Sequence, residues 1–219
     1  MQAAVAPLPD GQLEWIETDG VAYIDTGVRG TQPKGVRAKV LFPTNITNNM
    51  ILIGCEGALG EPDANKFSPI SLSINPLRLC FYYRYFYVSG SIDVSQHIAD
   101  CKVIDVYCQL KTGSQVLGAK EEGAGSYTTY SKTSTTNIQS LYNMYVFAIN
   151  YANTPIQKCA NGTRLLELTI YSDFNMTTEL RAFKPWRLNG EVGLMDTLTN
   201  TFYGNAAGSG AFTGGPNVI

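Results

Sequence analysis

The stretch KVIDVYCQLKTGSQVLGAK, residues 102–120, decides the fold class of this chain. Every second residue of its first half is apolar and belongs to one face of an extended strand: Ile104, Val106, Cys108 and Leu110. Successive side chains of a strand point to opposite sides of a sheet, so this period of two indicates a half-buried strand. Lys111-Thr112-Gly113 then supplies turn residues, and the stretch predicts a β-hairpin with its turn near Gly113.

The same alternation recurs in VRAKVLF (36–42) and RLLELTIY (164–171). The apolar faces that it predicts are Val36, Ala38, Val40 and Phe42 in the first run, and Leu166, Leu168 and Ile170 in the second. Helical periodicity is nearly absent, and only SQHIADC (95–101) and SDFNMTTEL (172–180) suit a short helical turn. Many short strands without intervening helices predict an all-β sandwich or barrel.

The chain reads as one domain of 219 residues, because no linker, composition shift or repeat divides it. We expect a single β domain over residues 13–214. Residues 1–12, with prolines at 7 and 9, predict an extended N-terminal arm, and residues 215–219 predict a C-terminal tail.

Charge and hydropathy exclude two classes of partner. The chain has 16 Lys and Arg against 18 Asp and Glu, a formal net charge of −2. Proteins that bind nucleic acid usually carry a basic excess, so we expect no nucleic-acid partner. No apolar run approaches the roughly 20 residues that a membrane helix needs, so we expect no membrane insertion.

The cysteines and the N-terminus indicate assembly in a reducing compartment. Five cysteines at irregular spacing, without a C-x-x-C pair, predict reduced structural thiols rather than disulfides or a zinc site. The N-terminal residues lack the positive charge and apolar core of a secretory signal. Three triplets match the glycosylation pattern, beginning at Asn45, Asn161 and Asn175, and we interpret them as coincidental.

The run FYYRYFYVSG, residues 81–90, has aromatic residues on both faces of a predicted continuous strand. One face begins with Leu77, Leu79 and Phe81 and predicts part of the core. The opposite face mixes arginine with rings, in Tyr82, Arg84 and Phe86, and predicts a surface that is partly wet.

Three segments resemble a known family. They are similar to strands of the concanavalin A-like, laminin G-like jelly-roll domains of bacterial surface proteins and phage particles. The segments are LEWIETDGVAYIDTGV near the start, LYNMYVFAIN in the middle, and RLLELTIY…RAFKPW…EVGLMD…FYGNAAGSGAFTGG at the end. They cover roughly half of the chain in the expected order. The resemblance implies an antiparallel jelly-roll sandwich of two sheets, one of them concave.

In lectins of this superfamily, the concave face or its rim loops receive a glycan. The resemblance therefore implies a site for a glycan or a partner at Tyr82, Arg84 and Phe86, with further polar groups from the rim loop INYANT, namely Asn150 and Tyr151. The open alternative is that these aromatic residues are buried by a loop, the N-terminal arm or another subunit, since aromatic residues and arginine are enriched in protein interfaces.

Metal and catalytic chemistry have little support in the sequence. Relatives bind Ca²⁺ at a rim, and the loop EPDANKF offers Asp63 and Asn65 as weak candidate ligands; otherwise we expect no cofactor. Glucanases of the superfamily use paired carboxylates at strand spacing, a pattern that this chain lacks. With His97 as the only histidine, we expect no enzyme.

The resemblance and the N-terminus together favour a lectin-like protein on a phage virion surface, assembled in the host cytoplasm, that attaches to a cell-surface glycan. We expect a homo-oligomer. Two alternatives stay open: a purely structural decoration or fibre subunit whose partners are other virion proteins, and a lectin exported to a bacterial cell surface.

Overall fold

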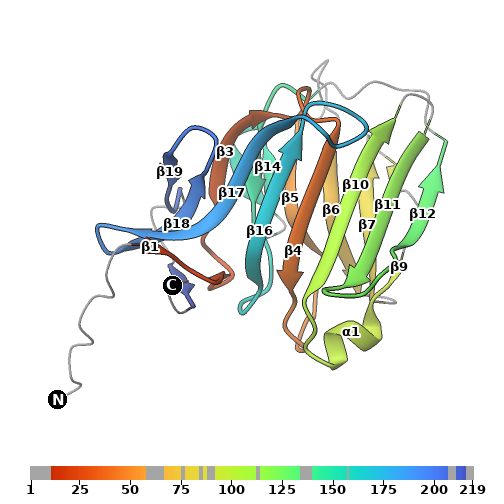
Figure 1. The fold of residues 1–219 in the computed structure, drawn as a ribbon, viewed down its shortest axis with the longest axis horizontal. Helices are drawn as coiled ribbons and strands as arrows, with labels where there is room; N and C mark the ends of the chain where they lie inside the picture. Colours follow the sequence, from red (N-terminus) through yellow and green to blue (C-terminus); the bar gives the residue numbers. More distant parts are fainter. Residues whose placement is uncertain are drawn as a thin grey trace.

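The computed structural model of the chain is a β-sandwich of two layers (Figure 1). It describes residues 11–57, 67–74, 77–83, 86–87, 92–111, 114–133, 140–156, 158–206 and 211–215. In this part of the chain, 11 strands form one sheet and nine form the other, and we call them the large sheet and the small sheet. The predicted fold class, an all-β jelly-roll sandwich of two antiparallel sheets, is confirmed.

The large sheet follows the order β12-β11-β10-β4-β16-β17-β18-β19, with β1 beside β17, β2 beside β16, and β20 beside β2. Its strands are β1 (Gly11–Gln12), β2 (Ile16–Thr18), β4 (Gly35–Leu41), β10 (Ile104–Lys111), β11 (Ser114–Glu121), β12 (Thr128–Lys132), β16 (Arg164–Tyr171), β17 (Glu179–Leu188), β18 (Glu191–Asp196), β19 (Thr201–Tyr203) and β20 (Phe212–Gly214). The predicted hairpin is confirmed as β10 and β11, in which Lys111 pairs with Ser114.

The small sheet follows the order β15-β14-β5-β6-β7-β8, with β13 joining β3 to β5 and β9 beside β7. Its strands are β3 (Ile24–Arg29), β5 (Met50–Glu56), β6 (Phe67–Ile74), β7 (Leu77–Tyr83), β8 (Phe86–Tyr87), β9 (Ile92–Asp93), β13 (Asn143–Val146), β14 (Ile149–Tyr151) and β15 (Thr154–Ile156). Among the described strands, only β14 and β5 pair in parallel. The short helix α1 (Ser95–Ala99) lies in SQHIADC, as predicted.

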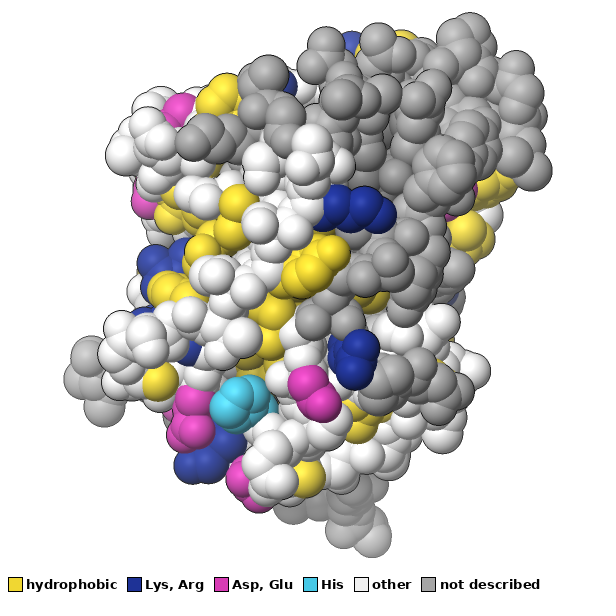
Figure 2. Space-filling view, turned by 90° about the vertical axis from the view of Figure 1, so that its right-hand side faces the viewer, with side chains coloured by type: hydrophobic (Ala, Val, Ile, Leu, Met, Phe, Trp, Pro, Cys, Tyr) yellow, Lys and Arg dark blue, Asp and Glu magenta, His cyan; other side chains and the backbone are white. Residues whose placement is uncertain are grey.

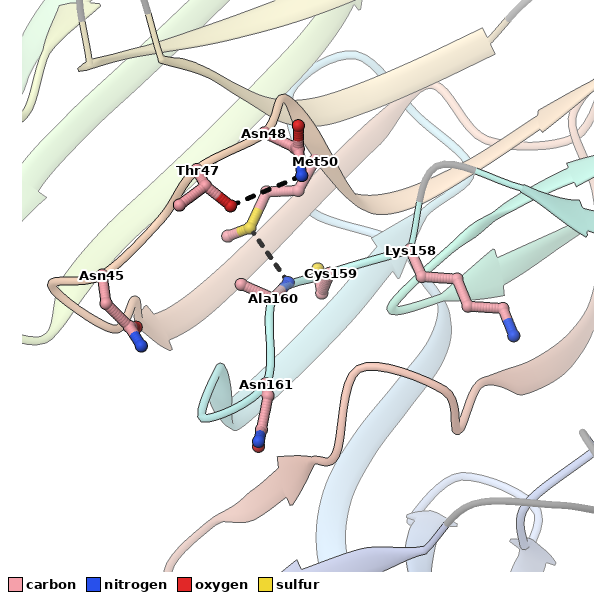
Figure 3. A pocket seen from close by; sticks show the side chains of 8 residues that line it. All are labelled: Asn45, Thr47, Asn48, Met50, Lys158, Cys159, Ala160 and Asn161. Carbon is pink, nitrogen blue, oxygen red and sulfur yellow. Dashed lines mark hydrogen bonds between the residues drawn. The ribbon is translucent and has the colours of Figure 1, made fainter.

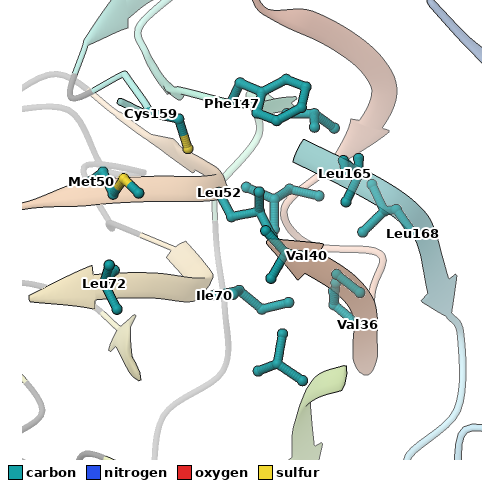
Figure 4. Packing of buried hydrophobic residues seen from close by; sticks show 14 of the residues in the cluster. Val36, Val40, Met50, Leu52, Ile70, Leu72, Phe147, Cys159, Leu165 and Leu168 are labelled. Atoms are coloured by element: carbon teal, nitrogen blue, oxygen red, sulfur yellow. The ribbon is translucent and has the colours of Figure 1, made fainter. Parts of the chain in front are cut away.

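One hydrophobic core fills the space between the sheets (Figure 4). Val36 and Val40 of β4 and Leu168 of β16 face Leu52 of β5 and Ile70 of β6 across it. The predicted inner faces of residues 36–42 and 104–110 are confirmed, since each of their apolar residues is at most 7% exposed. Full burial of one such side chain contributes about 1.5–3 kcal/mol, so the alternating pattern alone supplies a strong drive to this register.

A β-bulge changes the predicted inner face of β16. Leu165 pairs with Val40 and Glu167 with Lys39, so the extra residue, Leu166, has no direct partner on β4. The bulge shifts the alternation by one residue, and Leu165 and Leu168 both enter the core while Leu166 is half-buried. The prediction that Leu166 belongs to the core face is therefore wrong, whereas Leu168 and Ile170 lie there as predicted.

The aromatic run is a hairpin rather than one continuous strand. β7 pairs with β8 antiparallel, with Tyr82 opposite Tyr87 and Tyr83 opposite Phe86. Tyr82 and Phe86 therefore lie on two different strands that pair antiparallel. Leu79 and Phe81 of β7 are buried in the core, as predicted.

Both ends of the domain extend further than predicted, and one loop replaces a predicted helical turn. Gly11 and Gln12, assigned to the arm, form β1 and pair with Arg187 and Trp186. Gly215, assigned to the tail, donates its N–H to the carbonyl of Trp15 at 2.9 Å. SDFNMTTEL is not helical, because the Asp173 carboxylate accepts hydrogen bonds from the backbone of residues 175, 177 and 178 and closes a loop before β17.

Candidate functional site

Two loops meet at the end of the sandwich where β4 ends and β16 begins. Leu41 pairs with Arg164 across these strands, so the chain that leaves β4 and the chain that enters β16 start side by side. The loop before β16 is fixed from two sides: Cys159 donates its N–H to the carbonyl of Phe147, and Gly162, at a φ of +87°, donates its N–H to that of Thr18. A left-handed φ of this kind suits glycine.

Between these loops lies a depression of about 290 Å³, which we call the rim pocket (Figure 3). It is lined by Asn45, Thr47, Asn48, Met50, Lys158, Cys159, Ala160 and Asn161. Its size lies at the lower limit of small-molecule pockets, which suits one sugar-sized ring rather than a long ligand.

The floor of the rim pocket is apolar and rich in sulfur. Met50 is 2% exposed and Cys159 is 3% exposed. The Cys159 thiol donates a hydrogen bond to the carbonyl of Ile51 at 3.2 Å, and the backbone N–H of Ala160 donates to the thioether of Met50 at 3.4 Å. Burial raises the pKa of the Cys159 thiol, so this group stays neutral and is a packing residue rather than a nucleophile.

The rim of the pocket carries exposed amides and a hydroxyl. Asn48 donates to the Thr47 hydroxyl at 3.4 Å. The side-chain amides of Asn45 and Asn161 form no hydrogen bond within the part of the chain that the structure describes. Lys158 extends away from Met50 and Ala160, with its ammonium 6.0 Å from the ring centroid of Tyr23. The pocket therefore presents uncharged hydrogen-bonding groups above an apolar floor.

A second polar region covers the outer surface of the large sheet, and we call it the charged face. It consists of Arg37, Lys39, Asp105, Tyr107, Lys120, Tyr127, Glu167 and Lys184. At its centre, Arg37 binds Asp105 through two hydrogen bonds of 2.9 and 2.6 Å, and the Tyr127 hydroxyl donates to the same carboxylate at 2.7 Å. This bidentate arrangement is the strong form of such a pair.

These contacts shift the pKa values of the central groups. Burial alone would raise the pKa of Asp105, but the hydrogen bonds from Arg37 and Tyr127 outweigh it and hold that pKa below its ordinary value. Burial, aided by the hydrogen bond to Asp105, raises the pKa of Tyr127 to about 12. Asp105 thus stays ionised and Tyr127 stays protonated at neutral pH, which fixes the direction of their hydrogen bond.

The remaining charges of this face also pair with one another. Lys39 lies 3.0 Å from Glu122 and 3.5 Å from Glu167, and Lys184 lies 2.8 Å from Glu167. Burial would raise the pKa of Glu167, yet the two lysines hold it below its ordinary value. The Lys120 ammonium sits 4.7 Å from the ring centroid of Tyr127. Arg37, Lys39, Asp105, Glu167 and Lys184 of the charged face are therefore all held in ion pairs.

Three of the seven site residues expected from the sequence lie outside the part of the chain that the structure describes. Arg84, Asp63 and Asn65 are outside the described residues. Tyr82 and Phe86 are described as parts of β7 and β8, on the two arms of the hairpin. The expectation that Tyr82, Arg84 and Phe86 form one surface assumed a continuous strand; Tyr82 and Phe86 lie on two paired strands, and the shared surface stays a prediction.

Asn150 has a structural role that leaves it unsuited to a ligand. It is 1% exposed, donates to the carbonyl of Asn143 at 2.9 Å and accepts from the N–H of Asn153 at 2.7 Å. The buried amide thus closes the turn between β14 and β15, and the expected contact with a glycan is corrected. Tyr151 is half-exposed and pairs with Thr154 in the same hairpin.

The surface shows no dominant charge and no metal cluster where it is described. No group of three or more His, Cys, Asp or Glu residues that could hold a metal ion occurs within the described ranges. Figure 2 shows acidic and basic side chains interspersed on one face, without a patch of a single sign. In the same part of the chain, no helix has the length and apolar character needed to cross a membrane.

Comparison with known proteins gives no relative by sequence. No protein-family model and no curated protein matches the chain. A solved structure that it is similar to is that of Scytalido-glutamic peptidase with a peptide-based transition-state analogue, at 11% identity and a TM-score of 0.41. The match covers 83% of this chain and 91% of the peptidase.

This comparison corrects one expectation. The sequence led us to expect a chain without enzymatic activity, whereas the structure it is similar to belongs to an enzyme. The description of the chain as non-catalytic is therefore withdrawn. At this TM-score the similarity transfers neither an activity nor a catalytic residue to the chain.

Proposed function

We propose that this chain is a lectin-like attachment module, displayed on the surface of a phage virion, that binds a neutral glycan of the host surface in the rim pocket. The observation that carries the proposal is the combination of exposed amides, at Asn45 and Asn161, with a buried apolar floor at Met50. Asn45 and Asn161 are also where two of the Asn-x-Thr triplets begin, the one sequence signal that the pocket had.

A sugar ring has the chemistry that such a pocket accommodates. Its hydroxyl groups both donate and accept hydrogen bonds, as do the amides of Asn45 and Asn161. Its C–H faces are apolar and would lie on the Met50 thioether and the Ala160 methyl group. Apart from Lys158, whose ammonium extends toward the ring of Tyr23, the lining is uncharged, and this favours a neutral sugar over one that carries a carboxylate or sulfate.

The proposed setting rests on the family resemblance and on the cysteines. The three segments similar to laminin G-like jelly-roll domains are typical of phage particles and bacterial surfaces. The five cysteines are free, and four of them are buried, which suits assembly in a reducing cytoplasm. We expect a homo-oligomer, since several linked shallow sites gain effective concentration and compensate for weak binding at each.

A panel of methyl glycosides tests the function, with saturation-transfer NMR on the wild-type protein followed by affinity measurements on variants. Asn45→Ala and Asn161→Ala remove one rim amide each, and we expect each to weaken binding about three- to tenfold. Asn175→Ala is the matched control, because Asn175 is an exposed asparagine of the third Asn-x-Thr triplet in the loop before β17, away from the pocket.

The outcomes separate the candidate functions. Unchanged affinity in both pocket variants would contradict the rim pocket as the site. If no sugar binds the wild-type protein, attachment through a glycan is overturned, and a chain that still assembles would favour the alternative of a structural virion subunit. A sugar that binds only in the presence of Ca²⁺ would place the site elsewhere, at the loop of Asp63 and Asn65.

A further inference from the structure

The floor of the rim pocket contains a backbone donor that is poorly used. The N–H of Ala160 donates to the Met50 sulfur at 3.4 Å and forms no other hydrogen bond within the described part of the chain. A thioether is a weak acceptor. A carbonyl oxygen in its place would form a stronger hydrogen bond, so this N–H is available to a ligand that brings such an oxygen.

The groups around this donor are apolar. The Met50 side chain is 2% exposed and adaptable in shape, and the Ala160 methyl group and the Cys159 side chain complete the floor. The Cys159 thiol does not compete as a donor, because it is already bonded to the carbonyl of Ile51 at 3.2 Å. A ligand group that fits here needs an oxygen acceptor directly beside a small apolar group.

The rim offers the complementary polar partner. The side-chain carbonyl oxygens of Asn45 and Asn161 can accept a hydrogen bond, and neither is engaged with a described residue. A ligand N–H located between the floor and the rim would find an acceptor there. The floor thus requires a ligand with an oxygen acceptor and a small apolar group, and the rim requires a ligand N–H. An acetamido group has all three, in its carbonyl oxygen, its methyl group and its N–H.

We propose that the rim pocket recognises an acetamido group and that the ligand is an N-acetylhexosamine at the end of a glycan. This inference rests on the proposed function, since it names the sugar class for the same pocket. The acetamido oxygen takes the N–H of Ala160 from the Met50 sulfur, its methyl group packs on the Met50 side chain, and its N–H donates to Asn45 or Asn161.

The test compares three methyl glycosides that differ at one position: N-acetylglucosamine, glucosamine and glucose. Affinities are measured by calorimetry, and the amide resonance of Ala160 is followed in ¹⁵N-labelled protein. We expect N-acetylglucosamine to bind about tenfold more tightly than glucose, which corresponds to one hydrogen bond and one buried methyl group. We also expect the Ala160 N–H resonance to move downfield as its acceptor changes from sulfur to oxygen.

Two variants sharpen the result. Met50→Leu keeps the floor apolar but removes the sulfur, so we expect it to retain the preference for N-acetylglucosamine. Ala160→Pro removes the N–H, and we expect the affinities for the two sugars to become equal. Because proline could disturb the loop, the Ala160 resonance of the wild-type protein provides the independent readout.

The outcomes distinguish the inference from the function on which it rests. Equal affinity for glucose and N-acetylglucosamine, with binding still dependent on Asn161, would overturn the inference and leave the proposed function in place. A preference for N-acetylglucosamine with an unmoved Ala160 resonance would overturn it as well. Absence of binding by all three sugars, and by the wider panel, would overturn the proposed function itself.

Discussion

The charged face and the rim pocket are both polar, but they use their polar groups in opposite ways. On the charged face, Asp105 accepts three hydrogen bonds from Arg37 and Tyr127, and Glu167 lies between two lysines. In the rim pocket, the amides of Asn45 and Asn161 have no described partner, and the N–H of Ala160 has only a sulfur acceptor.

The difference follows from where each region lies. The charged face is built on five neighbouring strands, and their register places opposite charges next to each other, as in Asp105 opposite Lys39 and Glu167 opposite Lys39. The pocket is built on loops, where no ladder fixes a partner for each polar group. The charged face is therefore structural, whereas the rim pocket keeps hydrogen-bonding groups available for a ligand.

The largest effect is expected at the centre of the charged face. Asp105→Ala leaves the Arg37 guanidinium and the Tyr127 hydroxyl without their acceptor, and we expect a loss of about 2–3 kcal/mol in the free energy of unfolding. The half-exposed Arg37 can recover some water, so the loss stays below that of a fully buried pair. Urea unfolding measures it.

The exposed pair of Lys102 and Glu121 is the control for this variant. Both side chains are 40% exposed or more, at 3.1 Å from each other. Lys102→Ala should change the free energy of unfolding by less than about 1 kcal/mol. Equal losses in the two variants would contradict the structural role of Asp105.

A somewhat smaller effect is expected at Gly118, which pairs with Tyr107 on the neighbouring strand. A Cβ atom at Gly118 would overlap the Tyr107 ring, which packs edge-on against Tyr127 at 4.9 Å between ring centroids. Gly118→Ala should therefore cost about 1–3 kcal/mol and change the near-ultraviolet circular dichroism of the tyrosines. Gly125→Ala, where a Cβ would meet nothing within 4 Å, should stay within about 0.5 kcal/mol of the wild type.

A third, smaller effect is expected in the pH dependence of the free energy of unfolding, to which Asp105 contributes. Its pKa in the folded protein is lowered, so its contribution is fully present above the ordinary carboxyl value of about 3.9 and is lost as the pH falls through the folded pKa. The difference in unfolding free energy between the wild type and Asp105→Asn should be constant from pH 7 to 5 and shrink below about pH 4. A difference that grows on acidification would contradict the lowered pKa.

Much of the fold follows from the sequence, because period-two alternation is a direct consequence of burying one face of a strand. It correctly predicts the inner faces of residues 36–42 and 104–110. It fails at Leu166, since a bulge depends on the neighbouring strand and leaves no local mark. It also fails at the antiparallel pairing of β7 with β8, because the sequence FYYRYFY has none of the Gly, Pro, Asn or Asp residues that mark turns.

The rim pocket could not be predicted from the sequence pattern either, because it also depends on strand pairing. Asn45 and Asn161 are more than a hundred residues apart, and only the pairing of Leu41 with Arg164 brings their loops together. The Asn-x-Thr triplets mark these loops, but a triplet of this kind is common in a chain rich in asparagine and threonine. The burial of Asn150 could not be predicted, because the sequence pattern of a turn asparagine is the same whether its amide faces a ligand or bonds to its own backbone.

Calorimetric titration of the best sugar from the panel into three proteins, the wild type, Asn161→Ala and Asp105→Asn, tests the central distinction most directly. The account predicts that Asn161→Ala loses about three- to tenfold in affinity, while Asp105→Asn, although less stable, binds like the wild type as long as it is folded. Loss of affinity in folded Asp105→Asn, with Asn161→Ala unaffected, would place the ligand on the charged face and contradict the account.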